Sequence, residues 1–325
     1  MKRVNFGSTT ETGDSDYQGC TELSELTGTD NLKTIGANTF NGCEKLENFK
    51  FGSSLNSIGE AAFAHTRLAT ADMSSSSLES IGAWAFAGNS HLGNVLLPKM
   101  MKSIGDGAFF DCPALTNITL PEGIATLADY TFKGASKLES MAVPEGITNI
   151  GQYALKGADN IIDVTLPSSL ESIGDNAMEG MSALKYIGAT ALTAVPALGK
   201  DVWNDVNQPA VRLDVNEDIA NEFESAEQWQ DFDINPINSS EAPIIAIDSI
   251  SVRGRFDGYT LHIVATGVEI NYIELFDTAG IQLMRYDTGG ADSAAIDTST
   301  LSTSIFMVRC TLSNNTAASL KLARK

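Results

Sequence analysis

Apolar side chains recur along the first part of the chain at intervals of 23 residues. Each unit is centred on an isoleucine or leucine, and these residues are Ile35, Ile58, Ile81, Ile104, Leu127, Ile150 and Ile173. Another apolar residue precedes each of them by three positions, and a further one, a phenylalanine in five of the units, follows by five positions. A spacing held over seven units predicts a solenoid, in which each coil covers the apolar side chains of its neighbour.

Later in each unit, apolar and polar residues alternate over a short run, as around Val164 and Leu166. This period of two predicts a short strand. Stacked coils place such strands side by side, about 4.8 Å apart, in a parallel sheet. A proline, which has no N–H for the ladder, follows four of the strands, at Pro98, Pro121, Pro144 and Pro167.

Two departures from the repeat are informative. In the second unit the apolar run falls one residue early, at Leu68, Ala71 and Met73, and an extra serine within 74–77 restores the spacing. A glycine follows the central isoleucine in six units, but Ala128 takes its place in the unit of Leu127. We therefore expect this position to require a small residue rather than a positive φ.

The motif SIGDGAFFDCPALTNITLPEGI, at residues 103–124, resembles the BspA-type leucine-rich repeat of bacterial surface proteins. The resemblance covers residues 12–190. It implies a curved leucine-rich-repeat solenoid whose parallel sheet lines the concave side. Members of this family are typically adhesin-like and are often secreted or surface-exposed.

Both ends of the solenoid are expected to carry caps. Residues 1–31 contain a partial first coil, because Tyr17 and Leu23 are in phase with the repeats that occupy 32–190. Residues 191–234 look like a closing segment, with a strand at Val211–Val215 followed by an amphipathic helix. Its apolar stripe would be Ile219, Phe223, Ala226 and Trp229.

The rest of the chain has a different pattern. NPINSSEAP, at 235–243, is typical of a linker, and 244–325 alternates apolar and polar residues between turn signals. We predict a small antiparallel, Ig-like β-sandwich there, with a hairpin turn at 277–280.

This tail resembles the C-terminal sorting domain of type IX secretion substrates in IELFDTAGIQL, IDTSTLSTSIFMVRC and SLKLARK. It departs from that pattern at Ser304, Ile305 and Phe306, where Gly-Ile-Tyr is common. The resemblance implies a role in export or attachment, and an accessory sandwich with no sorting role is the alternative.

Charge limits the classes of partner. The formal net charge is −20, and residues 1–243 hold 33 acidic and 14 basic side chains, against 8 and 7 in 244–325. Such acidity argues against binding to nucleic acid or to an anionic membrane. No apolar run is long enough to cross a bilayer. The first residues, MKRVNFGSTTETGDSD, lack a signal-peptide core, and we expect such a signal to have been removed.

Candidate chemistry is sparse. Cys20, Cys43 and Cys112 share one repeat position, which predicts buried thiols. Cys20 and Cys43 lie on adjacent coils, where a disulfide or two reduced thiols are both open, and Cys310 falls in an alternating strand. No catalytic, nucleotide or metal motif occurs. We expect neither enzymatic activity nor a cofactor or metal.

Two sets of residues are candidates for ligand binding. The first consists of outward positions of the predicted strands, and its members are Asn94, Asn117, Thr119, Asp163, Thr165 and Tyr186. The second is an aromatic stripe three residues after the central isoleucine, at Trp84, Tyr130 and Tyr153. Aromatic side chains favour interface contacts, but half-buried packing on the convex side is the alternative for this stripe.

The repeats, together with the two family resemblances, imply a secreted or cell-surface adhesion or recognition module. It would bind a protein or glycan at a host or cell surface through its solenoid. The alternative is a structural component of a bacterial surface layer or complex, with no soluble ligand. The oligomeric state stays open.

Overall fold

The computed structural model describes residues 1–237, 245–247, 250–257, 259–266, 269–276, 282–302, 305–313 and 317–324. The chain forms two compact units. One comprises Met1–Leu213 with Ile219–Asn235, and the other comprises Asp214–Asp218 with Pro236–Lys325.

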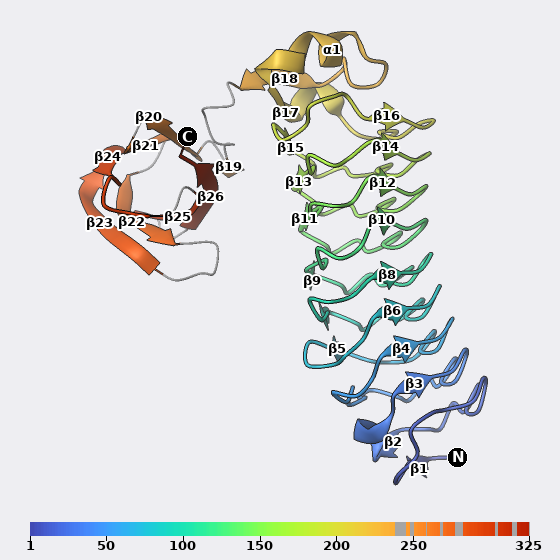
Figure 1. Ribbon diagram of the computed structural model, residues 1–325. Coiled ribbons are helices and arrows are strands. Elements are labelled where there is room, and N and C mark those ends of the chain that lie inside the picture. Colours follow the sequence, from blue (N-terminus) through green and yellow to red (C-terminus); the bar gives the residue numbers. More distant parts are fainter. Residues whose placement is uncertain are drawn as a thin grey trace. The chain divides into compact units, whose positions relative to one another are not determined.

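The first unit is a solenoid with a ladder of parallel strands along each of two sides (Figure 1). We number the coils from 1, which contains Ile35, to 7, which contains Ile173. The strands that end at the repeat residue form the isoleucine ladder: β3 (Thr34–Ile35), β4 (Ser57–Ile58), β6 (Ser80–Ile81), β8 (Ser103–Ile104), β10 (Thr126–Leu127), β12 (Asn149–Ile150), β14 (Ser172–Ile173) and β16 (Ala197–Leu198). This second ladder was not expected from the sequence.

The alternating runs form the strand face, which was expected. Its strands are β5 (Thr70–Asp72), β7 (Asn94–Leu96), β9 (Asn117–Ile118), β11 (Ser140–Ala142), β13 (Asp163–Thr165), β15 (Tyr186–Ala189), β17 (Arg212–Asn216) and β18 (Asp233–Ile237). Thr70 pairs with Asn94, 24 positions away, whereas Asn94 pairs with Asn117, 23 positions away. The one-residue slip of the second unit is thus confirmed, and Ala71 is fully buried as that slip requires.

A column of phenylalanine rings runs through the core of the solenoid. Phe40, Phe63, Phe86, Phe109 and Phe132 are fully buried. Consecutive rings stack with centroids 5.2 to 5.6 Å apart. Burial of one such side chain contributes about 1.5–3 kcal/mol, so this column is a principal source of stability for the stack.

The N-terminal cap begins earlier than the repeat phase indicates. β1 (Arg3–Asn5) pairs in parallel with β2 (Glu25–Thr27), and the short 3-10 helix η1 (Thr29–Asn31) follows. Residues from Arg3 onward therefore already belong to the stack.

The C-terminal cap contains the 3-10 helices η2 (Gln208–Ala210) and η3 (Glu217–Ile219) and the helix α1 (Ala220–Ser225). The prediction of a helix reaching Trp229 was wrong, because the backbone becomes extended at Ala226. Phe223 and Trp229 are nevertheless buried, and Trp229 packs against Trp203 at 5.3 Å between ring centroids. The apolar spacing therefore reflects the core of the cap rather than one helical stripe.

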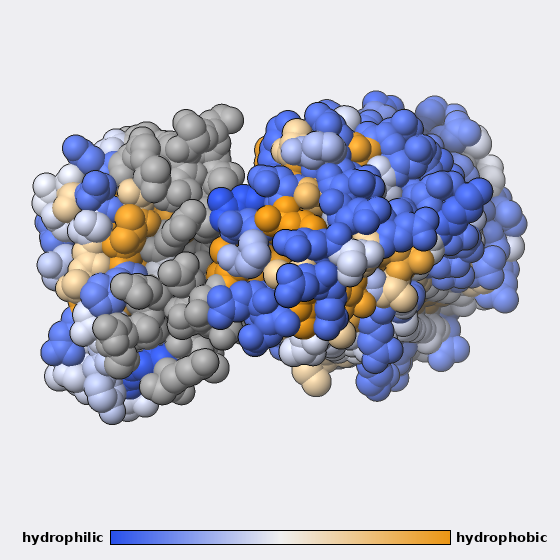
Figure 2. All heavy atoms as spheres, turned by 90° about the horizontal axis from the view of Figure 1, so that it is seen from above, coloured by the Kyte–Doolittle hydropathy of each residue, from blue (hydrophilic) through white to orange (hydrophobic). Residues whose placement is uncertain are grey.

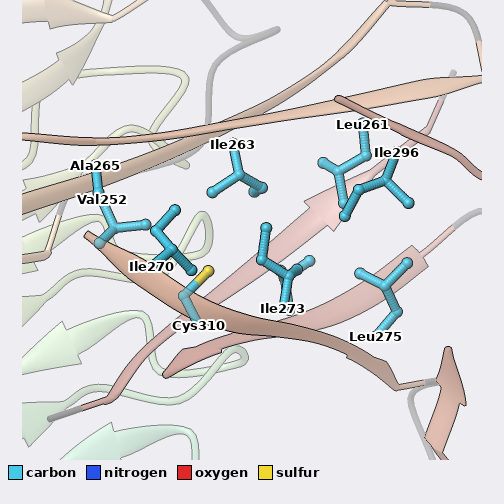
Figure 3. Close-up of a cluster of buried hydrophobic side chains, with 10 residues drawn as sticks. Val252, Leu261, Ile263, Ala265, Ile270, Ile273, Leu275, Ile296 and Cys310 are labelled. Atoms are coloured by element: carbon cyan, nitrogen blue, oxygen red, sulfur yellow. The ribbon is translucent and has the colours of Figure 1, made fainter. Parts of the chain in front are cut away.

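The second unit contains two four-stranded antiparallel sheets. One has the order β19 (Ile245–Ile247), β20 (Ile250–Asp257), β21 (Thr260–Thr266), β24 (Ser293–Asp297); the other has the order β23 (Gln282–Ala291), β22 (Ile270–Phe276), β25 (Ile305–Leu312), β26 (Ala317–Ala323). Their shared core includes Leu261, Ile273, Ile296 and Cys310 (Figure 3). The predicted turn at 277–280 and Ser304 lie outside the described residues, as do positions 238–243 of the linker.

Viewed from the cap end, the solenoid surface is mostly hydrophilic (Figure 2). Among the described residues, no helix is long and apolar enough to span a membrane.

Candidate binding surfaces of the solenoid

The outward residues of the strand face lie where the alternation places them, with one exception. Asn94, Asn117, Thr119, Asp163 and Thr165 are exposed. Tyr186 was expected to face outward, but it is only 6% exposed. All four residues of β15 are buried, between β13 and β17.

The position of the Tyr186 ring has a local cause. Its hydroxyl oxygen lies 3.1 Å from the point that a Cβ on Gly188 would occupy. The ring therefore lies along its own strand, over a residue with no side chain. Tyr186 is thus part of the packed end of the stack and is removed from the candidate surface.

The strand face is hollowed at coils 3 and 4 by a groove of about 450 Å³. Its walls are Ser74, Asn94, Val95, Leu96, Leu97, Lys99, Asn117, Ile118, Thr119, Leu120, Pro121 and Glu122. Three of the predicted residues, Asn94, Asn117 and Thr119, thus come together. Leu96, which the sequence did not single out, is 43% exposed there. Amide groups beside exposed apolar surface are typical of a site for a macromolecular ligand.

The groove lies where neighbouring coils separate. In regular coils the N–H after the strand donates to the next coil, as from Met73 to Leu96, Val143 to Thr165 and Leu166 to Gly188, over 2.8 to 3.1 Å. The equivalent hydrogen bonds, from Leu97 N–H to the carbonyl of Thr119 and from Leu120 N–H to that of Ala142, are not formed in the described part of the chain.

Pairing on the strand face is reduced accordingly. β9 pairs with β7 over two residues, whereas β5 and β7 pair over three. β9 and β11 belong to separate sheets, so the ladder is interrupted between coils 4 and 5. Ile118 is partly exposed, although Val95 and Met141, its equivalents in the neighbouring coils, are buried.

The isoleucine ladder is interrupted between the same two coils, β8 and β10 (Figure 1). Elsewhere the glycine after the repeat isoleucine donates its N–H to the preceding coil, as from Gly105 to Ile81 over 2.9 Å. A Cβ on Gly105 would lie 2.5 Å from the backbone nitrogen of Ala83. Ala128 carries such a Cβ. The hydrogen bond from its N–H to the carbonyl of Ile104 is not formed among the described residues.

Ala128 therefore explains the interruption as a steric effect. The glycines at this position have no positive φ, so the expectation that small size is what matters there is confirmed. With an alanine, coils 4 and 5 cannot approach closely on that side.

The turn side of the solenoid, the segment from three to seven residues after each repeat residue, is continuous across the same boundary. Gly107 donates to Asp129, Phe109 to Thr131 and Asp111 to Lys133, over 2.7 to 3.0 Å. The separation of coils 4 and 5 is thus confined to the two ladders.

The aromatic stripe lies on this turn side. Tyr130 and Tyr153 stack with centroids 5.1 Å apart, which confirms that they are neighbours, and Trp84 approaches Tyr130 at 6.0 Å. Trp84 spans the intervening coil because Gly107 leaves room for its ring: a Cβ there would lie 2.4 Å from it.

All three aromatic residues have a positive φ, between 56° and 60°. That conformation is unusual for bulky residues, and the equivalent positions of other coils hold Asn38, Ala61, Gly107 and Asn176. Lys133 Nζ lies 5.1 to 5.6 Å from the ring centroids of Phe110, Tyr130 and Tyr153. The rings therefore contact one another and an internal cation, which favours the packing interpretation.

A smaller groove of about 430 Å³ lies nearer the N-terminus, on the strand face of the first coils. Phe49 and Phe51 form part of its wall. Lys50, which also lines it, is paired with Asp30 at 2.8 Å, so this cation already has a partner.

The cysteines are not placed for chemistry. All four are free thiols; Cys43, Cys112 and Cys310 are buried, whereas Cys20 is only partly so. Burial raises the pKa of Cys43 to about 11 and that of Cys112 to about 12. Protonated, buried thiols are inert as nucleophiles. Across the described residues, no group of three His, Cys, Asp or Glu side chains is arranged to hold a metal.

The model of the BspA type leucine rich repeat region matches this chain in six copies, over residues 10–134 and 92–197. These ranges cover more than half of the 325 residues. The chain belongs to the BspA-type leucine-rich repeat family. A search of curated proteins returned no match.

One solved structure that is similar to this chain shows a related architecture. A leucine-rich repeat protein from Bacteroides ovatus is 25% identical, with a TM-score of 0.58 over 66% of this chain and 55% of its own. This chain therefore matches little more than half of that protein. A leucine rich cell surface protein from Faecalibacterium prausnitzii (21% identity, 58% of this chain and 73% of that one) and the pneumococcal vaccine antigen PcpA (16%, 73% and 89%) both give a TM-score of 0.32. These last two similarities are too low to bear on fold or function here.

Proposed function

We propose that this protein is a non-catalytic recognition module of the bacterial cell surface that binds a protein or glycan through the groove at coils 3 and 4. The observation that carries this proposal is the groove itself. It brings Asn94, Asn117 and Thr119 together with the exposed Leu96, on a surface where coils 5 to 7 are closed. Solenoids commonly use such extended surfaces for binding.

The aromatic stripe is the less favoured surface. Ring faces give binding energy when they are free to contact a ligand, and those of Tyr130 and Tyr153 contact each other. Asp163 and Thr165, which the sequence also predicted, lie on coil 6, outside the groove, and are not part of the proposed site.

Membership of the family supports placement outside the cell, and we propose that the C-terminal sandwich serves export or surface attachment. Deletion of residues 244–325 in the source bacterium is expected to abolish surface display, measured with antibody on intact cells. Unchanged display would leave the sandwich as an accessory domain.

The binding proposal is tested with the full chain against immobilised extracellular-matrix proteins and a glycan array. The variant with Asn94→Ala and Asn117→Ala is expected to weaken a saturable interaction by about tenfold or more, because each lost polar contact contributes about 0.5–1.5 kcal/mol. The matched control, Asp163→Ala with Thr165→Ala, alters equivalent outward positions of β13 and should bind as the unaltered chain does.

Two results would count against this proposal. Equal loss in both variants would mean that the groove has no special role. No binding to either panel, together with concentration-dependent association of the full chain in light scattering, would favour a structural component of a surface assembly.

A further inference from the structure

The groove differs from a side-chain pocket in one respect: part of its wall is backbone. Leu97 and Thr119 lie in it on opposite coils, and Leu97 N–H would donate to Thr119 C=O if coils 3 and 4 were regularly paired. That bond is not formed among the described residues, although its equivalents are formed from Met73, Val143 and Leu166. The groove therefore presents a strand-type donor and acceptor.

We propose that the occupant of the groove is an extended polypeptide segment of a partner protein, inserted between residues 96–99 and 119–122. Its backbone accepts a hydrogen bond from Leu97 N–H and donates one to Thr119 C=O. This inference rests on the proposed function and names the class of ligand. Extended peptides that hydrogen-bond to unpaired backbone groups of a sheet gain affinity from the backbone and specificity from side chains.

The lining of the groove suits such a segment. Leu96 and Ile118 offer exposed apolar surface, and Pro121 lies at the end of the coil 4 wall. An extended peptide places alternate side chains on opposite sides, so one set contacts this apolar surface while the other faces the solvent. Asn94 and Asn117 pair in register on β7 and β9, and their amides are outward donors and acceptors beside the segment.

Ala128 is assigned the role of keeping the site open. Its Cβ holds coil 5 away from coil 4, which leaves β9 without a partner on that side and only two paired residues on the other. Ala128→Gly removes the obstruction. We expect it to restore the bond to Ile104, to bring coil 4 back into the regular stack and to narrow the groove.

The experiment uses a phage-displayed library of random linear peptides, panned against the full chain. Enriched peptides are then synthesised with a methyl group on one backbone nitrogen at a time. A single methylation removes one donor and leaves every side chain in place. We expect one or two positions at which it weakens binding by at least about tenfold, while methylation elsewhere is tolerated.

The protein side is tested with Ala128→Gly and with Ala61→Gly as its matched control. Ala61 has a positive φ of 50°, which glycine adopts readily, and it lies outside the groove. Ala128→Gly is expected to slow hydrogen exchange at residues 126–128 and to weaken peptide binding at least about tenfold. Ala61→Gly should leave binding unchanged.

The contrary outcomes are distinct. Methylated peptides that all bind like the parent, or a library that yields no peptide while a glycan binds, would overturn the inference. If the Asn94→Ala, Asn117→Ala variant then lost the glycan, the proposed function would still stand. Slower exchange in Ala128→Gly with undiminished peptide binding, or no change in exchange, would overturn the role of Ala128.

Discussion

At the boundary between coils 4 and 5 the two sides of the solenoid behave differently. On the turn side the hydrogen bonds continue from Gly107, Phe109 and Asp111 into coil 5. On the ladder sides, β8 and β10 are unpaired with each other, as are β9 and β11. On the isoleucine ladder, Ala128 in place of a glycine accounts for the interruption without any change in the apolar repeat.

The comparison shows that a solenoid can keep its core while opening its surface. Phe109 and Phe132 stack at 5.6 Å across the boundary at which both ladders are interrupted. The inward positions hold the stack together, and the backbone contacts at the corners decide where it is open. A binding surface can therefore arise from a local failure of the repeat.

Truncation of the phenylalanine column should give the largest loss of stability. Phe109→Ala removes a fully buried ring that stacks on Phe86 and Phe132, so the free energy of unfolding should fall by about 3–5 kcal/mol. Urea denaturation followed by circular dichroism measures this. Leu96→Ala, at an exposed position, should change it by less than about 0.5 kcal/mol; a small effect of Phe109→Ala would show that the coils are not held by this column.

A second interruption should be possible to create. Gly105→Ala places a Cβ 2.5 Å from the backbone nitrogen of Ala83, and such overpacking costs about 1–3 kcal/mol. The expected result is lower stability and faster hydrogen exchange of the backbone N–H at position 105, which in the unaltered chain donates to the carbonyl of Ile81. Unchanged exchange would mean that a Cβ at this position does not separate coils, which would also weaken the explanation based on Ala128.

The aromatic stripe should contribute to stability and not to binding. Tyr130→Ala loses the contacts with Trp84, Tyr153 and Lys133, so stability should fall by about 1 kcal/mol. Ala61 holds the equivalent position in coil 2 with a φ of 50°, so the backbone tolerates alanine. Ligand affinity in the surface screen should be unaltered; a marked loss would move the binding site to the turn side.

The smallest effect concerns Asp163, on the closed part of the strand face. Although the side chain as a whole is exposed, partial desolvation of its carboxyl by neighbouring atoms raises the pKa of this group above its usual value. The ionised form therefore destabilises the fold above the folded-state pKa. That destabilisation disappears as the pH falls to the unfolded-state value and below. Asp163→Asn should therefore be slightly more stable than the unaltered protein at neutral pH, and thermal melts should show the difference shrinking in acid; a difference that grew in acid would contradict this.

The sequence predicts much of the solenoid because the inward positions repeat. Even the slip around Ala71 was recognisable from the run of serines after it. The isoleucine ladder was missed because strands of two residues, such as Ser80–Ile81, show no alternation. Periodicity also could not reveal that Tyr186 turns along its own strand over Gly188.

The groove could not be predicted from pattern alone. Ala128 is visible in the sequence as an exception, but its consequence depends on the direction of its Cβ toward the preceding coil. The loss of the bonds from Leu97 and Leu120 follows from how the coils stack, and no single residue marks it. Exposed Leu96 occupies an outward position that elsewhere holds a polar or small residue, and it is a second exception that is visible in the sequence.

The strand face is open at coils 3 to 5, whereas coils 2 and 3 and coils 5 to 7 are hydrogen-bonded to one another along it. Hydrogen exchange at single-residue resolution on the full chain tests it directly. We expect rapid exchange at Leu97 and Leu120, and slow exchange at Met73, Val143 and Leu166, whose N–H groups bond to the next coil. Equal protection at all five positions would contradict it, because the stack would then be regular and the groove would have no open edge.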